Sequence, residues 1–173
     1  MPSREPREIR SAYRGRFLSV DIEDWPGNGS WEVVRMPDAA AVLPITPDRN
    51  VLLVGQFRPP IRDDLVEIPA GLMDVPGEDA LTCASRELLE ETGYRHTGIE
   101  FLGGMYVSPG STGHYVHLFV ARTAETPEGN VEEGIELSRR PFAEMLDAAR
   151  SGRVRDAKTA IALLLTAARP SLP

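Results

Sequence analysis

Alternating apolar and polar residues predict several short β-strands in the first two thirds of the chain, because successive side chains of a strand point to opposite faces of its sheet. Two of these stretches, 17–22 and 31–35, flank the turn-rich sequence PGNGS and predict a hairpin. The polar residues before them, up to about Ser11, are expected to be mobile or to exchange between subunits. The strands predicted in this way are 17–22, 31–35, 39–45, 51–57, 99–106 and 115–121.

Helical periodicity is clearest in the middle of the chain, where 78–91 carries apolar residues three and four positions apart. Leu81, Ala84 and Leu88 fall on one side of this helix and are expected to face the core. Gly93 follows directly, in the place where a glycine in the left-handed conformation commonly ends a helix. We therefore predict one helix between the fourth and fifth strands.

Two further helices are predicted in the C-terminal third, at 141–151 and 156–168. Pro141 suits the first turn of the former, and Asp156 suits the N-cap of the latter. The last helix is apolar nearly all round, through the sequence IALLL at 161–165. It should therefore be buried in the core or pack against another subunit. This mixture of strands and helices fits an α/β fold.

Composition and charge exclude several classes of protein. The chain has 173 residues and a formal net charge of −7 at pH 7. This length suits one domain with a real core, and this charge argues against a nucleic-acid partner, because such binding depends on clustered Lys and Arg. No apolar run approaches the roughly 20 residues needed to cross a bilayer, and the N-terminal sequence MPSREPREIR lacks the apolar core of a signal peptide. We expect a cytoplasmic protein without membrane contact, in which the single cysteine, Cys83, has no catalytic role.

The predicted central helix carries three glutamates that can share one face. Glu87, Glu90 and Glu91 lie three and four positions apart, so their oxygens can point at a common place. Carboxylates this close repel one another unless a cation joins them. Oxygen donors suit Mg²⁺ or Mn²⁺, and Mg²⁺ is usually held together with substrate phosphates. The sequence therefore predicts a divalent-metal site and a diphosphate substrate.

The segment from Gly71 to Tyr94, GLMDVPGEDALTCASRELLEETGY, resembles the signature of the Nudix hydrolases. The second half of the signature is filled in register by Arg86, Glu87, Leu88, Glu90, Glu91, Gly93 and Tyr94. The first half departs from it, since six residues rather than the usual five separate Gly71 from Glu78. The resemblance implies an α/β/α sandwich with a mixed β-sheet. It also implies that Glu87, Glu90 and Glu91 bind Mg²⁺ or Mn²⁺ and that Arg86 holds these carboxylates in position.

Two segments outside the signature are similar to those of the ADP-ribose pyrophosphatase subfamily, and the likeness covers roughly 31–168. In the first segment, 56–71, the resemblance implies that Arg58 and Glu67 bind substrate and that the carbonyl of Ala70 binds metal. In the second, SPGSTGH at 108–114, Ser108 and Gly110 would contact substrate. The sequence DAKTAIALL also resembles the last helix of that subfamily.

The chain departs from the subfamily at the general base, because His114 stands where the subfamily usually has a glutamate. A neutral imidazole can accept a proton from water near neutral pH. Glu90 acts as the base in other branches of the family. Glu133 belongs to a later acidic segment, 132–136, that is expected to fold over the same site. Glu90, His114 and a later glutamate such as Glu133 are therefore all candidates.

The resemblance implies hydrolysis of ADP-ribose to AMP and ribose 5-phosphate. One alternative is a sister enzyme that acts on ADP-glucose or GDP-mannose, and another is a catalytically impaired module that only binds nucleotides. We expect an N-terminal region, 1–38, that serves in dimerisation or strand exchange, followed by the hydrolase domain, 39–173. Trp25 and Trp31 lie in this N-terminal region and are expected to pack in it or to stack on adenine from the partner subunit.

Overall fold

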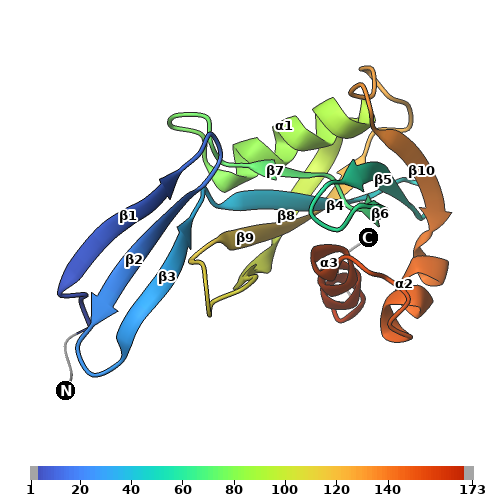
Figure 1. Ribbon diagram of the computed structural model, residues 1–173. Helices are drawn as coiled ribbons and strands as arrows, with labels where there is room; N and C mark the ends of the chain where they lie inside the picture. The colour runs from blue at the N-terminus through green and yellow to red at the C-terminus, as the bar shows by residue number, and fades with distance from the viewer. Residues whose placement is uncertain (1–3, 170–173) are drawn as a thin grey trace.

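The computed structural model describes residues 4–169, which form two β-sheets and three helices (Figure 1). The strands are β1 (Glu8–Arg14), β2 (Ser19–Trp25), β3 (Gly29–Arg35), β4 (Ala39–Ile45), β5 (Asn50–Arg58), β6 (Asp63–Glu67), β7 (Ala70–Leu72), β8 (His96–Tyr106), β9 (Tyr115–Thr123) and β10 (Glu136–Pro141). The helices are α1 (Ala80–Thr92), α2 (Phe142–Arg150) and α3 (Ala157–Ala167).

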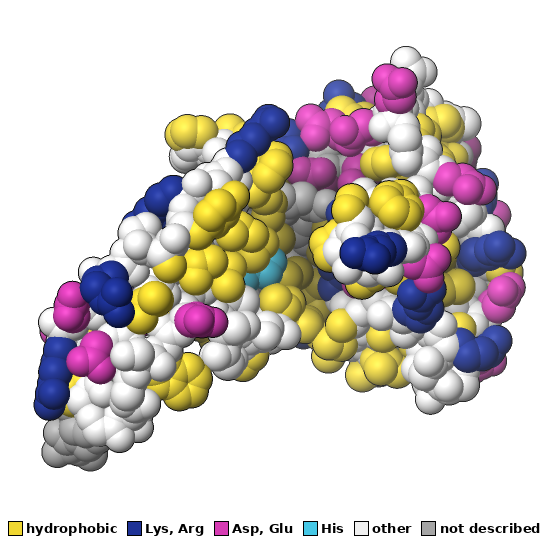
Figure 2. All heavy atoms as spheres, in the orientation of Figure 1, with side chains coloured by type: hydrophobic (Ala, Val, Ile, Leu, Met, Phe, Trp, Pro, Cys, Tyr) yellow, Lys and Arg dark blue, Asp and Glu magenta, His cyan; other side chains and the backbone are white. Residues whose placement is uncertain are grey.

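Strands β1, β2 and β3 form a separate antiparallel sheet that extends away from the rest of the molecule (Figure 1). Hydrophobic side chains gather over this sheet and the hollow beside it (Figure 2). The predicted hairpin is present as β2 and β3. The expectation of a mobile segment up to Ser11 is wrong from Glu8 onward, because these residues pair with β2. Every side chain of β1 is exposed, so its sequence has no alternation of apolar and polar residues that would predict a strand.

The larger sheet is mixed, as predicted. Its strand order is β10-β5-β4-β9-β8, with β6 paired to β5 and β7 paired to β4. Only the β4–β9 pair is parallel among the strand pairs found in residues 4–169. Strand β4 is buried along its whole length, which explains its unbroken apolar sequence. The short strands β6, β7 and β10 were not predicted, because their sequences DDLVE, AGL and ELSRRP show no clear alternation of apolar and polar residues.

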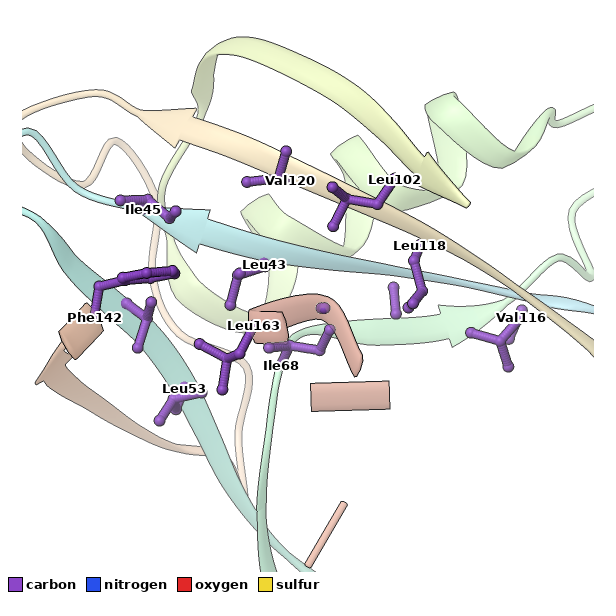
Figure 3. Packing of buried hydrophobic residues seen from close by; sticks show 14 residues of the cluster. Leu43, Ile45, Leu53, Ile68, Leu102, Val116, Leu118, Val120, Phe142 and Leu163 are labelled. Atoms are coloured by element: carbon purple, nitrogen blue, oxygen red, sulfur yellow. The ribbon is translucent and has the colours of Figure 1, made fainter. Parts of the chain in front are cut away.

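Helices cover both faces of the larger sheet, so the predicted α/β/α sandwich is confirmed. On one face α1 packs Cys83, Ala84 and Leu88 against β4 and β9. On the other face α2 and α3 contribute Phe142 and Leu163 to a second cluster (Figure 3). Both clusters begin at β4, since no residue before Ala39 belongs to either in the part of the chain that the structure describes.

The helix ends follow the predicted signals closely. Gly93 has φ 76° and its N–H donates to the carbonyl of Leu89. Asp156 caps α3, whereas Pro141 lies just before α2 rather than in its first turn. Leu81 was expected in the core but is 44 % exposed, because the buried face of α1 begins only at Cys83. Helical spacing predicts the direction in which a side chain points. It does not predict how far along the helix the sheet covers that side, and Leu81 lies beyond the covered part. No helix within residues 4–169 is long and apolar enough to span a membrane.

Candidate functional site

Two glutamates of α1 rest directly on the backbone of β7. The N–H of Ala70 donates to Oε2 of Glu91 at 3.0 Å. A Cβ added to Gly71 would lie 1.8 Å from Oε1 of Glu87, so a glycine is required for this close approach. Glu87 is only 8 % exposed and Glu91 only 6 %. The sequence predicted that these carboxylates share a face, and the structure shows that β7 forms the floor beneath them.

Burial of these glutamates makes their charged forms costly. Burial, and then the nearby charge of Glu87, raises the pKa of Glu91 to about 7. Burial also raises the pKa of Glu87, despite its ion pair with Arg86. The charge of Glu132 adds to both increases, and the backbone N–H of Glu132 donates to the carbonyl of Glu90 at 3.0 Å. The later acidic segment therefore lies beside the helix at Glu132, and both Glu132 and Glu133 are exposed.

These donors fit a hard divalent cation. Glu87 and Glu91 offer carboxylate oxygens beside the backbone of Ala70, and oxygen donors suit Mg²⁺ or Mn²⁺. No group of three or more His, Cys, Asp or Glu side chains within residues 4–169 is arranged to hold an ion. Backbone carbonyls, water or substrate oxygens would therefore complete the coordination, as is usual for Mg²⁺.

Arg86 joins the acidic side chains of the predicted signature. Its Nε and Nη2 donate to the carboxylate of Glu78 at 2.8 and 3.0 Å. Its Nη1 donates to Glu87 at 2.6 Å and to Glu90 at 2.9 Å. The hydrogen bond from Arg86 lowers the pKa of Glu78. Glu90 is half exposed and turned toward Arg86, so it stands apart from the buried pair of Glu87 and Glu91.

A pocket of about 400 Å³ adjoins the glutamates and contains two cations. Arg58 donates to Glu67 at 2.6 and 3.1 Å, and Lys158 Nζ donates to the same carboxylate. Burial would raise the pKa of Glu67, but these two cations outweigh burial and lower it. Lys158 was not predicted, because it lies 91 residues from Glu67. The lining includes Arg58, Ala70, Gly71, His114, Asp156 and Lys158.

The predicted loop brings His114 to the same pocket. Nδ1 of His114 lies 2.6 Å from the carbonyl of Pro37. A carbonyl only accepts, so in the neutral imidazole Nδ1 carries the proton and Nε2 has the lone pair. At the other end of the loop, Ser108 Oγ lies 3.1 Å from Ser111 Oγ.

A second pocket of about 370 Å³ lies on the other side of this loop, against the N-terminal sheet. Its aromatic lining consists of Trp25, Trp31 and Tyr106. Glu23 and Arg35 add a carboxylate and a guanidinium, which form an ion pair with each other. Asn28, Val33 and the loop residues 109–113 complete the lining. The N–H of Val34 donates to the carbonyl of Ser111 at 2.8 Å. The loop therefore lies between an aromatic pocket and a pocket lined by Arg58, Lys158 and the backbone of β7 on which the glutamates rest.

Comparison with known proteins gives the same assignment as the signature. Residues 35–162 match the NUDIX domain. The chain is 35% identical over 173 residues to the ADP-ribose pyrophosphatase of Bacillus subtilis (strain 168), covering 94% of this chain and 93% of that protein. It is also 35% identical over 159 residues to the methanol dehydrogenase activator of Bacillus methanolicus, covering 87% and 85%. Likewise, the GDP-mannose pyrophosphatase of Cronobacter sakazakii is 35% identical over 144 residues, covering 76% and 74%.

The fold also resembles a crystal structure of an ADP compounds hydrolase, with a TM-score of 0.77 over 95% of this chain and 94% of that one. The sequence identity of that pair is 23%, so this likeness concerns the fold. The matched domain covers most of the chain, and it includes the buried glutamates, Arg86 and the backbone of β7. The protein belongs to the Nudix hydrolase family.

Proposed function

We propose that the protein hydrolyses the diphosphate bond of a nucleoside diphosphate sugar, with ADP-ribose as its best substrate and AMP and ribose 5-phosphate as products. One observation carries this proposal. The buried carboxylates of Glu87 and Glu91 lie on the backbone of Ala70 and Gly71, beside a pocket that holds the cations of Arg58 and Lys158. This arrangement suits a substrate with several phosphate oxygens.

The residues of the site divide into two groups, those that would bind the metal ion and those that would bind the phosphate oxygens directly. Glu87, Glu91 and the carbonyl of Ala70 would hold Mg²⁺ or Mn²⁺, with Glu90 as a further ligand on the exposed side. A bound divalent ion would neutralise phosphate oxygens and make a water molecule a better nucleophile. The guanidinium of Arg58 would bind phosphate oxygens, because its planar donors match them. Glu67 keeps this guanidinium oriented through two hydrogen bonds, and because it is only 2 % exposed it would act on the substrate through Arg58.

His114 is our choice for the general base. Its Nε2 is free to accept a proton, and its ring lines the pocket together with Ala70. We expect His114→Asn to lower kcat by about 100-fold or more, which is typical for loss of a general base. His114→Glu should restore much of the rate, because a carboxylate can do the same work. Equal rates for wild type and His114→Asn would instead favour Glu90 or Glu133, which Glu90→Gln and Glu133→Gln would then separate.

The aromatic pocket would bind the nucleobase. Trp25 and Trp31 offer ring faces for stacking, while Glu23 and Arg35 offer hydrogen-bonding groups at the edge. Ser108 and Gly110, in the loop between the two pockets, would contact the ribose or the diphosphate that joins them. We expect Trp31→Ala to raise KM for ADP-ribose about 10-fold, with little change in kcat.

The experiment is product analysis with the purified chain, with Mg²⁺ or Mn²⁺ and a panel of ADP-ribose, ADP-glucose and GDP-mannose. AMP and ribose 5-phosphate should form fastest from ADP-ribose, and Glu91→Gln should abolish both products. Faster turnover of GDP-mannose or ADP-glucose would instead assign the sister activity. Nucleotide binding without turnover of any substrate would contradict hydrolysis and indicate a binding module.

We also propose that the chain forms a homodimer through its N-terminal sheet. Ile9 and Tyr13 on β1 are both about half exposed, and a second copy would cover them. Light scattering after size exclusion should give twice the mass of one chain. Ile9→Asp should shift this mass toward the monomer, whereas Val75→Asp, at a similarly exposed residue of the loop before α1, should not.

A further inference from the structure

The first turn of α3 is tied to the segment that leads into β7. Strand β6 ends at Glu67 and β7 begins at Ala70, so Ile68 and Pro69 lie between two strands. Pro69 has no N–H, and the N–H of Ile68 donates to Oγ1 of Thr159 at 2.8 Å. Ile68 is 1 % exposed and Thr159 is fully buried. A buried N–H needs a partner, and at this break in the sheet a side chain from α3 provides it.

Two more residues of the same turn strengthen this connection. Asp156 caps α3 by accepting from the backbone N–H of Thr159 at 2.9 Å, and it also accepts from the hydroxyl of Thr159. Lys158 donates to Asp156 at 3.0 Å and to Glu67. The side chain of Lys158 is only 16 % exposed. The chain from Glu67 to Ile68 is therefore held at both its side chain and its backbone by α3.

The connection ends at the buried carboxylates. Ala70 follows Ile68 by two residues, and its N–H donates to Glu91. Packing supports the same path, because Ile68 and Leu163 of α3 belong to the same cluster of the core (Figure 3). Only Pro69 separates Ile68 from Ala70. A shift of Ile68 would therefore move Ala70 relative to Glu91.

We propose that Thr159 and Lys158 are positioning residues that set the affinity of the Glu87–Glu91 site for divalent metal by holding Glu67 to Ala70 in place. This inference rests on the metal site of the proposed function. Groups that orient metal ligands commonly change metal affinity by about 10-fold to 100-fold when they are removed. The hydrogen bonds of both side chains go to Glu67, Ile68 and Asp156 rather than to Glu87 or Glu91, so their effect would pass through the backbone of Ala70.

The test is the binding of Mn²⁺ alone, measured by calorimetry on the full chain without nucleotide. Thr159→Val keeps the shape but removes the hydroxyl, and it should weaken Mn²⁺ binding about 10-fold. Thr159→Ser restores the hydroxyl and should bring the affinity back to within about 3-fold of wild type, even if its thermal midpoint is lower. Thr166→Val is the matched control, because Thr166 is a buried threonine of the same helix whose hydroxyl has no hydrogen-bond partner among the described residues. Hydrogen exchange at the Ile68 amide should speed up in Thr159→Val and not in Thr166→Val.

Lys158→Met gives an independent test that does not depend on the folding of Thr159→Val. Removing a positive charge near acidic ligands should by electrostatics alone tighten the binding of a cation. Positioning predicts the opposite, a loss of about 3-fold to 10-fold that Lys158→Arg reverses. Tighter or unchanged Mn²⁺ binding in Lys158→Met, or wild-type affinity in folded Thr159→Val, would overturn the proposal. If wild type and Glu91→Gln bind Mn²⁺ equally weakly, the metal site itself is wrong, and the proposed function fails with it.

Discussion

The buried carboxylate of Glu91 lowers the free energy of unfolding when it is charged, and a bound metal ion would offset this loss. Its carboxyl holds a proton more tightly in the folded chain, with a pKa of about 7, than in an unfolded chain, where the value is 4.5. The folded state therefore loses stability as the pH rises from 4.5 through 7 in the absence of metal. Glu91→Gln removes this titration. We expect the variant to exceed wild type in free energy of unfolding by up to about 3 kcal/mol at pH 8 and to match it at pH 4.5.

Urea unfolding in the presence of a chelator, at both pH values, measures this difference. Adding Mg²⁺ at pH 8 should reverse the order, because only wild type gains binding energy from the ion. A variant that is less stable than wild type at pH 8 with the chelator would contradict the raised pKa.

Arg86 illustrates why charge alone does not explain the signature. One guanidinium reaches Glu78, Glu87 and Glu90 at the same time, through donors with fixed geometry. Arg86→Lys keeps the charge but cannot make all of these bonds. We expect kcat to fall about 100-fold, which is typical of a misplaced catalytic group, and the free energy of unfolding to fall by about 1–2 kcal/mol. Steady-state kinetics and urea unfolding measure the two effects.

Arg95→Lys is the control for this substitution. Arg95 forms an exposed pair with Glu128 at 3.0 Å, and both side chains are more than half exposed. Exposed pairs contribute little, so activity should be unchanged and stability should change by less than about 0.5 kcal/mol. Equal losses in Arg86→Lys and Arg95→Lys would contradict a special role for Arg86.

Helix α1 packs its glutamates against strand β7, and Gly71 allows the close approach of the two elements. In Gly71→Ala the new methyl group would meet the carboxylate of Glu87 rather than backbone atoms. The carboxylate can swing away, so stability should fall only by about 1–2 kcal/mol. Mn²⁺ affinity should fall about 10-fold, because the ligand is displaced. Gly98→Ala in β8 is the control, since a methyl group there meets nothing within 4 Å.

Calorimetry and thermal unfolding of both glycine variants separate these effects. A large loss of stability with unchanged metal affinity in Gly71→Ala would show that Glu87 is held for packing rather than for metal binding.

In the molecule as a whole, the larger sheet and its helices carry the core and the glutamates, and the N-terminal sheet carries part of the aromatic pocket. No residue before Ala39 belongs to either core cluster in the described chain, whereas the aromatic pocket depends on β2 and β3. A shortened chain, 36–173, keeps Pro37 and therefore its contact with His114. We expect it to unfold cooperatively and to bind Mn²⁺ within about 3-fold of the full chain, because the core and the glutamates are intact. KM for ADP-ribose should rise roughly 10-fold or more with loss of the aromatic rings. Circular dichroism, calorimetry and steady-state kinetics test this division, which an unfolded fragment or an unchanged KM would contradict.

Local features of the sequence determined the helices, the apolar strands and the acidic face of α1. Glu87, Glu90 and Glu91 lie within five residues, so helical geometry alone fixes their common face. Caps such as Asp156 and Gly93 act within a few residues of their position, and the unbroken apolar run of β4 reflects burial on both sides. These features were predictable because each depends on neighbours in the chain.

Only the tertiary structure decided what surrounds that acidic face. The hydrogen bond from Ile68 to Thr159 joins residues 91 positions apart, as does the ion pair of Glu67 with Lys158. Strands β6 and β7 exist because they pair with β5 and β4, and their own sequences carry too little pattern to show it. Sequence period specifies which way a side chain points, but the register of a sheet and the packing of a distant helix specify what that side chain meets. The glutamates could therefore be predicted from the sequence, whereas the lining of the aromatic pocket and the hydrogen bonds of α3 with Glu67 and Ile68 could not.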